Sequence, residues 1–61
     1  MIEPGNRVIY RPLPTRSPAT LRLDGQQGVV VRVAEDDTGR AMLLFPDLTL
    51  LAARPDEMNG E

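Results

Sequence analysis

The chain has 61 residues, with 9 acidic and 7 basic side chains and neither histidine nor cysteine. This length allows a single domain, residues 1–61, whose core supplies only about 3–5 kcal/mol. The composition excludes disulfide bonds and metal sites built from thiolate or imidazole, so stability must come from tight packing, self-association or a host complex.

No apolar run approaches the roughly 18–20 residues that cross a bilayer, and the segment from Met1 to Gly5 lacks the features of a signal peptide. We therefore expect a soluble, complete chain with no membrane insertion. The absence of cysteine fits a reducing compartment, which favours a cytoplasmic location.

Charge is distributed unevenly along the chain. Residues 1–34 carry five arginines against two acids, whereas residues 35–61 carry two arginines against seven acids. All seven basic residues are arginine, whose planar guanidinium binds carboxylate and phosphate groups and suits interfaces. A GC-rich genome would produce the same preference for arginine without selection for binding.

The first predicted strand covers residues 5–11, between a Pro-Gly turn and the strand-ending Pro12. Its alternation places Val8 and Tyr10 on one side of a sheet and Arg7, Ile9 and Arg11 on the other. Residues 12–24 form a long loop with three prolines, in which Leu21 and Leu23 alternate with an arginine and predict a short strand.

The strongest signal is a β-hairpin with strands at residues 28–34 and 40–45. The first strand is rich in valine, and the five-residue turn ends in Gly39, which takes positive φ without steric cost. In the first strand Val29, Val31 and Val33 share one side, opposite Val30 and Arg32. In the second, Ala41, Leu43 and Phe45 oppose Met42 and Leu44.

After a Pro46-Asp47 turn, residues 48–53 predict a fourth strand with Leu48, Leu50 and Ala52 on one side. Pro55 stands at the start of a single 3₁₀ turn, and residues 59–61 are expected to fray. Short strands with Gly and Pro between them, and no sustained helical period, predict an all-β fold. At this length we expect a small, partly open barrel of four to five strands.

The order of motifs resembles a Src-homology-3-like (SH3-like) small barrel. The segments that carry this resemblance are Gly5-Asn6-Arg7-Val8-Ile9-Tyr10, then Gly25-Gln26-Gln27-Gly28-Val29-Val30-Val31-Arg32-Val33, a strand ending Leu44-Phe45, and the closing Pro55-Asp56-Glu57-Met58 turn. The Gly25–Val33 segment is similar to the KOW motif of ribosomal and transcription-elongation proteins. The order also looks like small accessory subunits of photosynthetic electron-transfer complexes, some of which help dock ferredoxin. The chain departs from the barrel pattern at its end, where the last strand is short or absent.

Catalysis is not expected, because histidine and cysteine supply the commonest general base and the best nucleophile. Asp36 and Asp37 fall in a hairpin turn, where solvated acids normally sit, and no EF-hand spacing follows them. The chain also lacks the Val-Gln-Ile-Tyr motif of the type II dihydrofolate reductases, which are enzymes built on such a barrel. We therefore expect no metal and no cofactor.

Protein binding is the favoured interpretation. If the odd-numbered valines line the barrel together with Val8, Tyr10, Leu43, Phe45 and Leu50, an apolar row of Ile9, Val30, Met42 and Leu44 points outward. Arg7, Arg11 and Arg32 flank this row, and Arg16 in the long loop is a lesser candidate contact. The row would instead be part of the core if the long loop folded over it. KOW-like nucleic-acid binding is the alternative, opposed by a pI near 4.9 and by only two aromatic residues.

Overall fold

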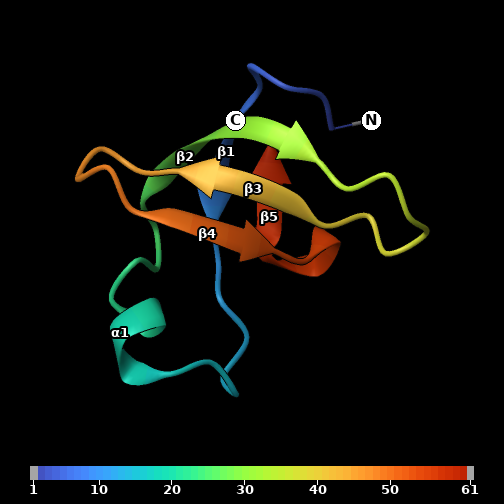
Figure 1. Ribbon diagram of the computed structural model, residues 1–61. Helices are drawn as coiled ribbons and strands as arrows, with labels where there is room; N and C mark the ends of the chain where they lie inside the picture. Colours follow the sequence, from blue (N-terminus) through green and yellow to red (C-terminus); the bar gives the residue numbers. More distant parts are fainter. Residues whose placement is uncertain (1, 61) are drawn as a thin grey trace.

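The computed structural model describes residues 2–60 and shows a five-stranded antiparallel sheet curled into a half-barrel (Figure 1). The sheet order is β4-β3-β2-β1-β5. The elements are β1 Arg7–Tyr10, α1 Pro18–Leu21, β2 Gln27–Val33, β3 Ala41–Leu44, β4 Leu50–Ala53, the 3₁₀ turn η1 Pro55–Glu57 and β5 Met58–Gly60. The all-β class and the 3₁₀ turn near the C-terminus are confirmed, and the fold is compatible with an SH3-like barrel. Within the described residues, neither helical segment is long and apolar enough to cross a bilayer.

The end of the chain is ordered by pairing, which corrects the expectation of a frayed tail for residues 59 and 60. Strand β5 runs antiparallel to β1, with Tyr10 opposite Met58 and Ile9 opposite Asn59. The final strand is therefore present but short, and it supplies partners for the side of β1 that faces away from β2. Glu61 lies outside the described residues.

The long loop contains a helical turn, α1, where a short strand was expected. The Ser17 hydroxyl accepts a hydrogen bond from the Thr20 N–H, and Pro18 stands at the first helical position. These two features are a helix-start signal, and they outweigh a two-residue alternation. Leu23 is still buried in the core, but it enters from a turn after the helix.

The core fills the concave side of the sheet. Its members are Val8, Tyr10, Leu23, Val30, Ala41, Leu43, Phe45 and Ala53. The Tyr10 and Phe45 rings meet edge to face, with centroids 5.6 Å apart. Gly28 lies against Phe45 and Leu43, and a Cβ there would stand 3.2 Å from Phe45 Cε1, so the close packing depends on the missing side chain.

The expected inward side of β2 is wrong for its first half. Val30 is 1% exposed and lies in the core, whereas Val29 and Val31 are 36% and 43% exposed and point outward. The pairing with β3 shifts register between Val30 and Arg32, which marks a β-bulge. A bulge adds one residue and reverses the alternation beyond it, so Val33 packs against the core as expected.

The expected inward side of β4 is also wrong. Leu50 is 59% exposed, while Leu51 packs against the core and Ala53 is buried. The reason is the length of the preceding turn. The Phe45 N–H donates to the Thr49 carbonyl, so the inward Phe45 fixes the odd-numbered residues of β4 on the inner side.

Candidate partner-binding face

The outward side of β2, β3 and β4 forms one continuous surface, which we call the outer face. Directly paired residues in an antiparallel sheet share a side and lie close together. Leu44 of β3 is opposite Val29 of β2 and also opposite Leu50 of β4. Their three aliphatic side chains lie side by side across three strands. From here on, the apolar row means these three residues, Val29, Leu44 and Leu50, in place of the row expected from the sequence. Leu44 is half-buried between its two more exposed neighbours.

The outer face changes from apolar to cationic along the strands. The next row consists of Arg32, Met42 and Ala52, which are paired in the same way. Beyond the inward pair of Ala41 and Ala53, the alternation turns Arg40 and Arg54 outward, and both are exposed. One end of the outer face is therefore apolar, and the other end carries guanidinium groups.

The outward side continues onto β1. Arg7 is opposite Val29, and Ile9, two residues further, is half-buried on the same side. At the turn between β3 and β4, Leu48 takes φ +68° and is 79% exposed. The apolar row thus has an arginine at one end and a second exposed leucine near the other.

The structure brings together five of the residues expected to contact a partner, namely Arg7, Ile9, Arg32, Met42 and Leu44. Val30 is not among them, because it is in the core, and its expected outward position is corrected to Val29 and Val31. The interpretation also missed Leu50. The turn length between Phe45 and Thr49 could have identified Leu50, whereas three consecutive valines give no signal for the bulge.

Arg11 lies beyond the end of β1, away from the apolar row. Its Nη1 is 3.3 Å from Asp24 Oδ1, and both side chains are more than half exposed. Such a surface ion pair contributes little to stability. Nothing in this geometry ties Arg11 to the outer face, so its role in binding stays a prediction.

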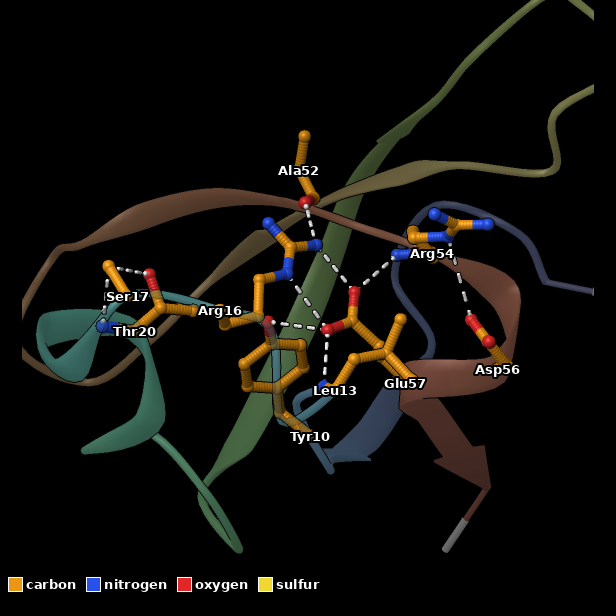
Figure 2. Close-up of polar contacts among 9 residues, drawn as sticks. All are labelled: Tyr10, Leu13, Arg16, Ser17, Thr20, Ala52, Arg54, Asp56 and Glu57. Atoms are coloured by element: carbon orange, nitrogen blue, oxygen red, sulfur yellow. Dashed lines mark hydrogen bonds and ion pairs between the residues drawn. The ribbon is translucent and has the colours of Figure 1, made fainter.

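Arg16 joins the long loop to a buried acid, Glu57, at the end of η1 (Figure 2). The Glu57 side chain is fully buried, and its carboxylate accepts five hydrogen bonds. Oε2 accepts from Tyr10 Oη at 3.2 Å, from the Leu13 N–H at 2.9 Å and from Arg16 Nε at 2.9 Å. Oε1 accepts from Arg16 Nη2 and from the Arg54 N–H.

The network keeps the Glu57 carboxylate ionised and the Tyr10 hydroxyl protonated near neutral pH. The hydrogen bond from Arg16 lowers the pKa of Glu57 to about 2, against the opposing effect of burial. Burial, with the charge of Glu57, raises the pKa of Tyr10 to about 12. A buried acid with a shifted pKa is a usual sign of catalysis. Here, however, the carboxylate is surrounded by donors, so Glu57 anchors the long loop and η1 to the core.

Arg16 also covers part of a sheet edge. Hydrogen bonds between β3 and β4 alternate along the strand, so the Ala52 carbonyl points to the open side of β4. Arg16 Nη2 donates to that carbonyl at 3.1 Å. Nothing in the sequence signals this contact, because Arg16 and Ala52 are 36 positions apart.

The acidic turn before β3 is structural. Asp36 Oδ1 accepts from the Thr38 N–H at 3.0 Å and from the Thr38 hydroxyl, and these bonds lower the pKa of the Asp36 carboxyl. Within residues 2–60, no group of three or more His, Cys, Asp or Glu side chains is placed to hold a metal ion. Comparison with protein-family models, curated proteins and solved structures found no match for this chain. Function is therefore inferred from the surface and charge of the molecule itself.

Proposed function

We propose that the protein is a non-catalytic protein-binding module, working as an accessory or adaptor subunit of a larger assembly or as a homo-oligomer. The observation that carries this proposal is the apolar row on the outer face. Val29 and Leu50 expose 36% and 59% of their surface on either side of Leu44. Single exposed apolar residues are ordinary on a protein surface. Neighbouring apolar residues on three adjacent strands instead form a patch of the kind that marks interaction sites.

The surroundings of the row favour a protein partner. Arg7 lies beside Val29, and Arg32 lies beside Met42 in the next row. Interfaces combine an apolar centre with a polar rim, and arginine is enriched in them. A partner that buries the apolar row would place acidic groups opposite these two arginines.

Nucleic-acid binding, the alternative implied by the KOW-like segment, is favoured by one observation, the arginines at the far end of the outer face. Two observations oppose it. The two aromatic residues, Tyr10 and Phe45, are buried, so they offer no stacking platform for bases. The chain is acidic overall, which weakens binding to a phosphate backbone.

A matched pair of substitutions tests the proposal. Leu50→Glu places a charge on the apolar row, whereas Leu21→Glu places one on α1, where Leu21 is 38% exposed. Circular dichroism is used to check that both variants fold. Self-association is measured by sedimentation velocity. Any protein captured from the native host is purified, and its affinity is measured by titration calorimetry.

We expect Leu50→Glu to weaken association by roughly tenfold or more, and Leu21→Glu to leave it unchanged. The proposal fails if the chain stays monomeric and binds no captured protein, or if the two variants behave alike. Tight binding to RNA that weakens steeply with salt would favour the nucleic-acid alternative instead.

A further inference from the structure

A hollow of about 300 Å³ opens beside β4, between the long loop and the residues at the start of β3 and the end of β4. We call it the arginine hollow. It is lined by Leu13, Thr15, Arg16, Arg40, Ala52 and Arg54. Half of the lining residues are arginine and none is acidic, although the whole chain carries a net charge of −2. Positive charge is therefore concentrated in one recess of an acidic protein.

Arg16 is held in position by contacts that leave donors unused. An arginine has five N–H donors. Nε and Nη2 bind Glu57 and the Ala52 carbonyl, whereas no hydrogen bond within residues 2–60 involves Nη1 (Figure 2). The Arg16 side chain is 26% exposed, so solvent reaches it. The buried Glu57 thus orients a guanidinium that still has donors to offer.

Arg40 and Arg54 complete the hollow from the ends of two paired strands. Arg40 directly precedes Ala41 and Arg54 directly follows Ala53, and Ala41 and Ala53 are paired across the strands, so both arginines are placed by the sheet. Within the described residues no hydrogen bond involves the Arg40 guanidinium. Arg54 Nε is 3.9 Å from Asp56 Oδ1 in an exposed pair, which is a weak interaction. Both arginines also line a second hollow of about 350 Å³, together with Thr38, Pro55 and Asp56.

The charge in this region favours an anion such as a phosphate group. Three guanidinium groups stand against two carboxylates, the buried Glu57 paired with Arg16 and the exposed Asp56 at 3.9 Å from Arg54, which leaves one net positive charge beside the recess. A phosphate monoester carries about −1.5 to −2 charges near neutral pH and has three acceptor oxygens. Arginine matches phosphate geometry with paired N–H donors, and an anion would relieve the repulsion among three neighbouring cations. We propose that the arginine hollow binds the phosphate group of a small phosphorylated molecule.

The first probe is inorganic phosphate, titrated into the full chain at neutral pH and constant ionic strength. Nuclear magnetic resonance follows the backbone amides and the arginine Nε–H groups. We expect saturable shifts at Arg40 and Arg54. Arg40→Gln and Arg54→Gln should each weaken phosphate binding by roughly tenfold. Arg22→Gln is the matched control, because Arg22 is an exposed arginine at the end of α1 and should change nothing.

Two further probes identify the source of the anion. Acetate tests a carboxylate, and a short thymidine oligonucleotide tests a phosphodiester backbone. Weaker binding of both than of phosphate supports the proposal. It is overturned if phosphate gives no saturable shift, if acetate or the oligonucleotide binds more tightly, or if Arg22→Gln is as damaging as Arg40→Gln. None of these residues belongs to the apolar row, so the result leaves the protein-binding proposal to its own test.

Discussion

Replacing Glu57 with glutamine should remove most of the free energy of folding, although the two side chains have the same shape. Every group around the carboxylate is a donor: the Tyr10 hydroxyl, two backbone N–H groups and two nitrogens of Arg16. A glutamine amide would present N–H groups to two or three of these donors, whichever way it turns. Arg16 would also lose its counter-charge at a partly buried site.

The magnitude follows from the shift in the pKa of Glu57. The pKa falls from 4.5 to about 2 in the folded protein, which means that folding favours the charged form by about 3 kcal/mol. Removing one partner of a buried ion pair costs about 3–5 kcal/mol in other proteins. A core of this size supplies about 3–5 kcal/mol in total. Glu57→Gln should therefore leave a large unfolded fraction at 25 °C.

Urea denaturation followed by far-ultraviolet circular dichroism measures this loss. The control is Asp56→Asn, which removes the neighbouring but exposed acid that pairs with Arg54 at 3.9 Å. That control should cost less than about 1 kcal/mol. A free energy of unfolding of Glu57→Gln within about 1 kcal/mol of the wild-type value would show that the buried carboxylate does not hold the fold together.

The wild-type protein gives a second measurement that needs no variant. Because the pKa of Glu57 is lowered on folding, its contribution is complete above about pH 4.5 and is lost as the pH falls towards 2. The free energy of unfolding should decrease across that interval. A stability that is flat between these two pH values would contradict the proposed role of Glu57.

Three other predictions concern Tyr10, two glycines and two valines. Tyr10 is the sole tyrosine, so absorbance at alkaline pH should show one titration with a midpoint near 12 in the folded chain and near 10 in urea. Because this pKa is raised, the stability it contributes is complete below pH 10 and is lost as the pH rises through 12. Gly39→Ala should destabilise the protein by roughly 1–3 kcal/mol more than Gly5→Ala in urea denaturation. Both glycines have positive φ, but only at Gly39 would a Cβ come 2.7 Å from Pro55 Cγ; equal losses would exclude that contact. Val30→Glu should unfold the domain and Val31→Glu should cost about 1 kcal/mol or less, and the reverse order would place the bulge elsewhere.

Local signals in the sequence were sufficient for much of the fold. The hairpin, the inward sides of β1 and β3 and the 3₁₀ turn at Pro55 all follow from alternation, turn residues and proline position. The outward positions of Met42 and Leu44 were predicted in the same way. Alternation is reliable in these strands because no extra residue interrupts the pairing.

The candidate sites needed the structure. Val29 and Leu50 replace Val30 on the outer face because a bulge in β2 and the turn before β4 set which side faces inward. The arginine hollow combines residues from the long loop, from the position just before β3 and from the end of β4, which are distant in sequence. Neither arrangement leaves a periodic pattern, since each depends on how one segment meets another.

The sequence by itself determined that this is a small all-β chain with a valine-rich hairpin, because each of those features depends on neighbouring residues. Tertiary structure alone decided that Glu57 would be buried among five donors and that Arg16 would be held against it. The physical reason is that a charge can be buried only where distant groups converge to satisfy it. That convergence is a property of the folded chain, and no single segment of the sequence predicts it.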